Sequence, residues 1–372
     1  IQNVYILNHG INFTNLSIIL AVWSACVLLL EIPSGILADK VGKKPTVVFA
    51  KFAYLIGIII FSVFPNIWGF VAGVIAFGVN ESFMSGAQES LLYDNLKDFG
   101  KEKLFGRILA MATTTREFGL GFGVLIAGFV TQIDVRYNLI GSIILATLGV
   151  LIAILLNEGR SHLQSEEVNL LKHFKDSVKV IFSNTKLARI LLFSITVISA
   201  YLVISEYFVP SLDKLGISYV SIGILAALEA IFFSLGSLIS QKISRFDAGI
   251  VYSLLSIIMG IFLLVITKAN PWSVIVGFMV LRIVKAIAEI YSMADWQKYV
   301  SSDQRATTIS INSFSENVIY IFFGILFGNI ADKYGLFNGF YLAAAIAFSY
   351  LGLMSILNTV KKGRSELINV KE

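Results

Sequence analysis

The chain has 372 residues, of which 56% are hydrophobic and 14% are charged, and its formal net charge is +5 at neutral pH. A soluble domain carries about 25% charged residues, so this composition excludes an ordinary water-soluble fold and makes a lipid bilayer the solvent. The basic excess lies between apolar segments, which favours contact with a membrane and argues against nucleic acid as a partner.

Cysteine and histidine are too sparse for the usual metal or disulfide chemistry. Cys26 is the single cysteine, and it lies inside an apolar segment. His9, His162 and His173 fall outside such segments and have no metal-ligand spacing. The glycine-rich phosphate loop of ATP hydrolases is also absent from the sequence. We therefore expect no metal, no cofactor and no ATP hydrolysis by that route.

Apolar segments long enough to cross a bilayer, about 20 residues each, follow one another along the chain. The expected spans are 16–37, 45–64, 67–92, 104–131, 136–157, 187–209, 217–241, 248–267, 271–297, 306–331 and 336–358. Residues 1–8 look like the outer end of another span that is too short to cross. Because the sequence starts with Ile1, we expect roughly 15–20 further residues upstream to complete that helix.

Basic residues set the expected orientation. If the loop at 38–44 is cytoplasmic, most lysines and arginines between spans fall on the cytoplasmic side, together with the C-terminus. The outside then holds only Arg136, Lys214, Lys268 and Lys333. This bias predicts a multi-pass protein of a plasma (inner) membrane with the loop at 38–44 inside.

The longest hydrophilic connection, 158–186, divides the chain into two halves. We expect an N-terminal helical bundle at 1–157, a linker at 158–186, a C-terminal bundle at 187–358 and a cytoplasmic tail at 359–372. Apolar residues recur at helical spacing in the linker, between lysines and histidines. This pattern predicts either an amphipathic helix on the inner leaflet or a plain linker helix without lipid contact.

The loop after the first complete span carries a specific motif. It reads Gly35-Ile-Leu-Ala-Asp39-Lys40-Val-Gly42-Lys43-Lys44. Gly35 permits close helix contact, Gly42 turns the chain, and Asp39 can face the positive end of a neighbouring helix. This loop resembles the signature loop of the major facilitator superfamily, and it lies where that family has it, between the second and third helices.

The resemblance extends over essentially the whole chain and implies its architecture. The expected fold is all-α, with two pseudo-symmetric six-helix bundles around a central cavity and alternating access to the two sides. The gate motif would consist of Gly35, Asp39, Lys40, Gly42, Lys43 and Lys44. Asp39 would close the gate against the start of family helix eleven, near Thr307 and Thr308. The family also implies a monomer whose partners are the bilayer, a small solute and a coupling ion.

Charged residues within the spans are costly in a bilayer and are therefore candidates for function. They avoid the family's four lipid-facing helices, apart from Lys51. Arg282, Lys285 and Glu289 are spaced to share one face of a helix. The residues that we expect to bind solute or protons are Glu81, Arg116, Arg282, Lys285, Glu289 and Glu316. For each of them a structural ion pair is the alternative.

A glycine pattern bears on the direction of transport. Gly119, Gly123 and Gly128 partly resemble the antiporter signature of the family's exporters, but Val124 replaces a proline and Ala127 a glycine. Close helix packing by small residues is the competing explanation.

These features predict a secondary active transporter of a small solute, coupled to protons and working as an efflux antiporter. A nutrient or metabolite uptake carrier of the same fold is the alternative. A non-transporting receptor or scaffold would lack charges in the middle of the membrane. A membrane enzyme would need a cluster of catalytic histidines or aspartates, which the sequence does not contain, so we expect no enzyme.

Overall fold

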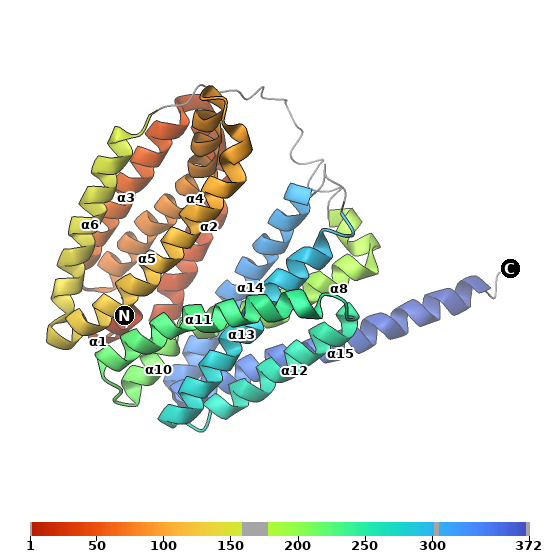
Figure 1. Ribbon diagram of the computed structural model, residues 1–372. Coiled ribbons are helices and arrows are strands. Elements are labelled where there is room, and N and C mark those ends of the chain that lie inside the picture. Colours follow the sequence, from red (N-terminus) through yellow and green to blue (C-terminus); the bar gives the residue numbers. More distant parts are fainter. Residues whose placement is uncertain (1, 158–177, 301–304, 370–372) are drawn as a thin grey trace. The chain divides into compact units, whose positions relative to one another are not determined.

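The computed structural model describes residues 2–157, 178–300 and 305–369, and the side chains of a few residues within these ranges are left out. The described residues are helical and include no strand. They form two compact units, Ile1–Glu167 with Gly216–Ala230 and Val168–Leu215 with Ile231–Glu372, here called unit 1 and unit 2. Figure 1 follows the helices along the chain. The expected amphipathic helix in the linker lies mostly outside the described residues; 178–183 are helical.

Unit 1 contains the helices of the first half of the chain. They are α1 (Gln2–Asn8), α2 (Phe13–Val41), α3 (Lys43–Val63), α4 (Ile67–Asp98), the short 3-10 helix η1 (Glu102–Leu104), α5 (Phe105–Ile133) and α6 (Val135–Leu155), together with the first part of α11 (Tyr219–Ile243). Asparagine and aspartate side chains cap several of these helices at their N-termini, as with Asn66 at α4, which accepts from the backbone of Trp68 and Gly69.

Helix α3 packs against α4 and α6, and α2 packs against α4. The contact between α3 and α4 is close because Gly57 and Gly73 face each other. A Cβ atom on Gly57 would lie 2.9 Å from the Ala76 side chain, and one on Gly73 would lie 3.1 Å from the Phe61 ring. Small residues therefore let the two backbones approach, as is common between helices in membranes.

Helix α1 lies at the end of unit 1 opposite the motif at 35–44. Val4, Tyr5 and Ile6 are buried. The Tyr5 ring lies 5.7 Å from Phe61, near the end of α3, and 6.0 Å from Phe70, near the start of α4. Residues 2–8 thus form a short helix packed on the bundle, as the sequence predicts.

Unit 2 contains the helices of the second half of the chain. They are α8 (Thr185–Phe193), the π-helical turn η2 (Ser194–Ile198), α9 (Ser199–Ser205), α10 (Phe208–Lys214), the second part of α11, α12 (Ala248–Ile266), α13 (Pro271–Trp296), α14 (Arg305–Tyr334) and α15 (Leu336–Asn369). Helix α12 packs against α13 and α15, and α14 packs against α9 and α15. Aromatic side chains fill the core of this unit, including Phe193, Tyr252 and Phe278.

Nine of the helices among the described residues are long and apolar enough to cross a membrane. The eleven expected spans all coincide with helices, but α5 and α13 are not among these nine. Both are long, at 29 and 26 residues. Charged residues, such as Arg116 on α5 and Arg282 on α13, lower the mean hydropathy of these two helices.

Candidate functional site

A group of charged side chains within an expected span lies in unit 2, on α13. This helix has a well-defined start, because Asn270 and Ser273 form a capping box and Pro271 occupies the first turn. Arg282, Lys285 and Glu289 follow on one face of the helix at intervals of three and four residues. Arg282 and Lys285 are half-buried and Glu289 is exposed.

Helix α11 places an aromatic ring beneath both cations of α13. The Arg282 guanidinium lies 4.9 Å from the centre of the Phe233 ring, and the Lys285 ammonium lies 5.4 Å from it. A cation close to an aromatic face is attracted to it, and the attraction grows when water is excluded. One ring therefore stabilises two positive charges in the same part of unit 2. The Arg282 Nη1 atom also lies 3.5 Å from the Tyr201 hydroxyl of α9.

The charges of the α13 face are partly neutralised within the helix. The Lys285 ammonium donates to the Glu289 carboxylate at 2.5 Å. The carboxylate of Glu289 is 51% exposed, whereas Lys285 is 15% exposed. An ion pair with one open member can exchange its partner for a charged solute or a proton without a large structural change.

Helix α14 contributes a carboxyl group to the same cluster. Glu316 is half-buried, and its Oε1 accepts from the Asn312 side chain at 2.7 Å. Ser194 of the π-turn lies beside this carboxyl, and Lys285 and Glu289 lie within electrostatic range. The structure thus brings together four of the six residues that the sequence singled out for the cavity, namely Arg282, Lys285, Glu289 and Glu316. This group is called the unit 2 cluster below.

Sequence reasoning missed several neighbours of this cluster. Phe233, Tyr201, Ser194 and Ser199 come from helices that are separated from α13 in sequence. Helical spacing identifies residues on the same face of one helix, but it cannot show which side chains of another helix meet that face. The one signal in the sequence was the presence of two cations in an apolar span, where each needs a neighbour that stabilises its charge.

The other two predicted cavity residues belong to unit 1. Glu81 on α4 and Arg116 on α5 are both exposed. Lys51, which is half-buried on α3, lies within electrostatic range of Glu81. Lys51 thus faces a carboxylate of its own unit, a contact that the sequence did not suggest. The side chain of Glu117, which follows Arg116 in the sequence, is not among those that the structure describes.

The gate motif lies at the junction of α2 and α3. Gly42 ends α2 with φ of +110°, a conformation that favours glycine. Lys40 is exposed and Lys44 is half-buried. Gly35 lies on α2 with open space around it. The side chain of Asp39 and the side chain of Thr307 are not described, so the expected closing contact of Asp39 lies outside the described residues.

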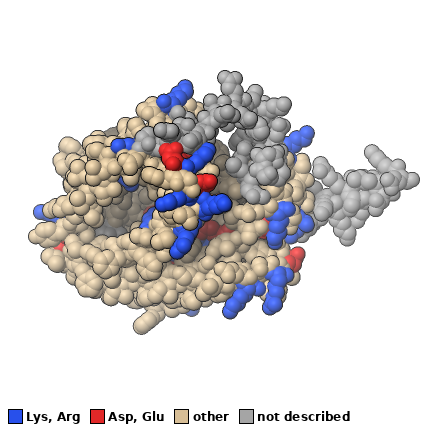
Figure 2. All heavy atoms as spheres, turned by 45° about the horizontal axis from the view of Figure 1, so that its top comes forward, with Lys and Arg blue, Asp and Glu red and all other residues tan. Residues whose placement is uncertain are grey.

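The motif is fixed to α4 by a buried ion pair. The Lys43 ammonium donates to the Asp94 carboxylate, and the two side chains are only 6% and 4% exposed. Lys43 begins α3 and Asp94 lies in the last turns of α4, so this pair joins the two helix ends. The sequence placed Lys43 in the gate motif but did not predict its pairing with Asp94. Figure 2 shows that basic side chains outnumber acidic ones on the face it presents.

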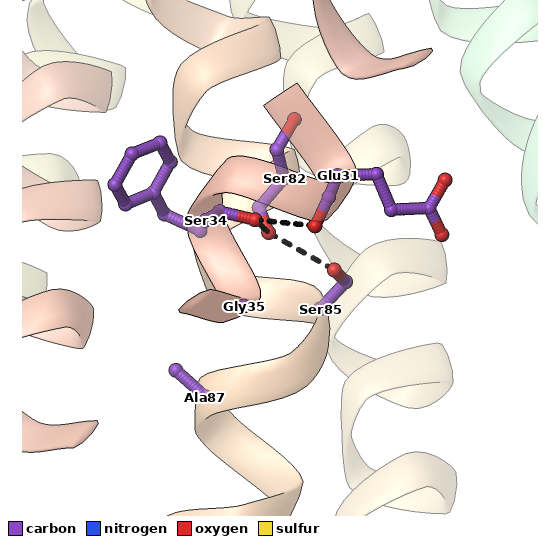
Figure 3. Close-up of a pocket in the computed structure, with 7 residues that line it drawn as sticks. Glu31, Ser34, Gly35, Ser82, Ser85 and Ala87 are labelled. Carbon is purple, nitrogen blue, oxygen red and sulfur yellow. Dashed lines mark hydrogen bonds between the residues drawn. The ribbon is translucent and has the colours of Figure 1, made fainter. Parts of the chain in front are cut away.

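A cavity of about 270 Å³ lies beside this end of α2 and α4. Glu31, Ser34 and Gly35 line it from α2, and Ser82, Phe83, Ser85 and Ala87 line it from α4. The Ser34 hydroxyl donates to the backbone oxygen of Ser82 at 2.9 Å, as Figure 3 shows. The serine hydroxyls of this region therefore hold the two helices together, and the Glu31 side chain extends away from them (Figure 3).

The glycine pattern of α5 takes part in packing at one position. A Cβ on Gly128 would lie 2.6 Å from the backbone oxygen of Tyr219 and 2.8 Å from Gly223, both on the first part of α11. Gly119 and Gly123 have open space at the corresponding position. Packing therefore explains Gly128 but not the other two glycines.

These features define a multi-pass α-helical membrane protein with charged side chains inside its spans. The chain belongs to the Major Facilitator Superfamily, whose family profile matches residues 2–319. It is similar over 370 residues to the uncharacterized MFS-type transporter YxaM of Bacillus subtilis (strain 168), with 22% identity over 96% of this chain and 91% of that protein.

Solved transporter structures share the fold. The crystal structure of the nucleoside transporter NupG superimposes with a TM-score of 0.76 at 15% identity, covering 95% of this chain and 93% of that one. A D-xylose-proton symporter gives a TM-score of 0.67 at 12% identity, covering 94% and 90%. The expected all-α membrane transporter fold is thus confirmed.

Proposed function

We propose that the protein is a proton-coupled exporter of a small solute that works by alternating access. The observation that carries the proposal is the unit 2 cluster, in which two cations and two carboxyl groups from α13 and α14 lie together inside membrane-spanning helices. Such charges are costly in a bilayer unless they bind a solute or an ion, or pair with one another.

The residues of the cluster suggest a division of roles. Arg282 and Lys285, held over the Phe233 ring, supply positive charge to a solute. Glu316 takes up and releases the proton, because its carboxyl is partly shielded from water and has a neutral hydrogen-bond partner in Asn312. Glu289 pairs with Lys285 when the solute is absent. Glu81 and Arg116 of unit 1 are proposed as further cavity residues.

The gate motif is proposed to control access from the cytoplasm. The Lys43–Asp94 pair fixes the start of α3 to the end of α4, and Asp39 is the proposed closing residue. Outward transport is the favoured direction because the glycine-rich segment of α5 partly resembles that of exporters, although the packing of Gly128 accounts for one of its positions.

Transport is tested in inverted membrane vesicles that have an acidic interior, with a pH-sensitive fluorescent dye as the readout. Uridine and D-xylose are suitable first probes, and a small organic anion suits the two cations of the cluster. An exporter that exchanges solute for protons raises the interior pH when its solute is added outside. An uptake symporter raises it only when the solute is preloaded inside. No response to any solute in either arrangement, over a broad panel, would refute the proposal.

The proposed orientation predicts which single cysteines react from each side of the membrane. In a Cys26→Ser background, a cysteine at Lys101 should react with a membrane-impermeant maleimide only after the cells are opened. Cysteines at Asn66 and Asp213 should react in sealed cells. The residues lie in or beside short connections between helices, where the backbone tolerates change. Labelling at Lys101 in sealed cells would show that the orientation is the reverse of the proposed one.

A further inference from the structure

The helix from Thr185 to Ser205 contains an irregular turn that faces the unit 2 cluster. In η2 the backbone N–H of Ser199 donates to the carbonyl of Ser194, five residues earlier. Residues five apart lie about 140° apart around a regular α-helix. The wider π-turn instead brings Ser194 and Ser199 toward the same side. Single π-turns inside α-helices are frequently found at functional sites.

Both serines meet the same residue of α14. The Ser199 hydroxyl lies 3.2 Å from the backbone oxygen of Glu316 and 3.4 Å from that of Ser194. The Ser194 hydroxyl lies beside the Glu316 carboxyl. The π-turn therefore contacts Glu316 at its backbone through one serine and at its side chain through the other.

The Ser194 hydroxyl lies beside the Glu316 carboxyl but does not form a regular hydrogen bond with it. Ser194 is 1% exposed, yet within the described parts of the chain its hydroxyl meets no partner at regular hydrogen-bond geometry. Leaving a buried polar group without a partner costs free energy, so a partner for the Ser194 hydroxyl is favoured. The carboxyl of Glu316 is beside it and can accept its hydrogen after a small shift of the turn.

The other groups around this carboxyl come from two helices. Asn312 of α14 donates to it at 2.7 Å. The charged groups that face it, Lys285 and Glu289, come from α13. Neither charged residue belongs to the helix that carries Ser194, so the hydroxyl is the contribution of the π-turn to the environment of Glu316.

We propose that Ser194 is a positioning residue for proton binding at Glu316. Its hydroxyl donates to the ionised carboxylate and moves away when the carboxyl takes up a proton from water, and the π-turn supplies the backbone adjustment. The serine keeps its own hydrogen throughout. The proposal rests on the proposed function in one respect, that Glu316 is the group that carries the proton.

The test is an infrared titration of the whole protein in lipid nanodiscs. The band of the protonated Glu316 carboxyl is identified by its loss in Glu316→Gln. In Ser194→Ala the pH at which half of this band remains should move up by about 0.5–1 unit, because the carboxylate loses a donor. Ser194→Thr keeps the hydroxyl and should retain the wild-type midpoint.

Ser211→Ala is the matched control, because Ser211 is fully buried in α10 of the same unit and its hydroxyl also lacks a partner among the described residues. An unchanged midpoint in Ser194→Ala, or an equal shift in Ser211→Ala, overturns the proposal. If Ser194→Ala does not fold, Ser194→Cys, with its weaker donor, must give a smaller upward shift, and no shift overturns it. The vesicle assay tests transport separately, so the two proposals fail in distinguishable ways.

Discussion

Replacement of Glu316 by glutamine should abolish proton-driven transport and leave binding of the solute in place. Glutamine has the shape of the protonated side chain and can still accept the hydrogen bond from Asn312, but it cannot take up or release a proton. The measurement is the dye response of inverted vesicles to a solute that the wild-type protein transports.

Solute exchange without a pH gradient separates coupling from binding. Glu316→Gln should retain exchange of labelled for unlabelled solute at a rate close to that of the wild type. Asn317→Ala is the control on the same turn of α14, because the Asn317 side chain donates to the backbone oxygen of Ser313 within its own helix. Gradient-driven transport at the wild-type rate in Glu316→Gln would show that another group carries the proton.

Apolar segments of about 20 residues were sufficient to predict the main elements of the fold. The expected spans coincide with helices because each apolar segment can satisfy its backbone hydrogen bonds only internally. The same reasoning did not reveal the π-turn at Ser194–Ile198 or the break at Glu206–Tyr207. These irregularities leave the composition apolar, so a hydropathy window cannot detect them.

The candidate site could be predicted only in part, because spacing in the sequence relates residues of one helix but not residues of different helices. Arg282, Lys285 and Glu289 could be grouped because they share one helix, and Glu316 was singled out because carboxyl groups are rare in spans. That these four lie together, with Phe233 beneath the two cations, depends on contacts between helices that are far apart in sequence. The same limit explains why Lys43 was singled out in the gate motif while its partner Asp94 was not predicted.

Breaking the Lys43–Asp94 pair is the second change with a large expected effect, in this case on the stability of the fold. Asp94→Asn removes the carboxylate charge that faces the buried Lys43 ammonium in this pair, and loss of one partner of a buried pair costs about 3–5 kcal/mol. We expect a clear fall in the apparent unfolding temperature of the purified protein in detergent, measured at a fixed heating rate. Lys40→Met, which changes an exposed lysine of the same motif, should have little effect.

The double variant Lys43→Met with Asp94→Leu measures what the ion pair contributes to stability and to transport. Two apolar side chains of similar size remove both buried charges, and such replacements are often neutral or stabilising. The unfolding temperature should therefore return to or above the wild-type value, while transport falls if the pair also fixes the gate between α3 and α4. A double variant as unstable as Asp94→Asn would show that attraction between the two charges, and not the cost of burying a lysine that has lost Asp94, holds these helix ends together.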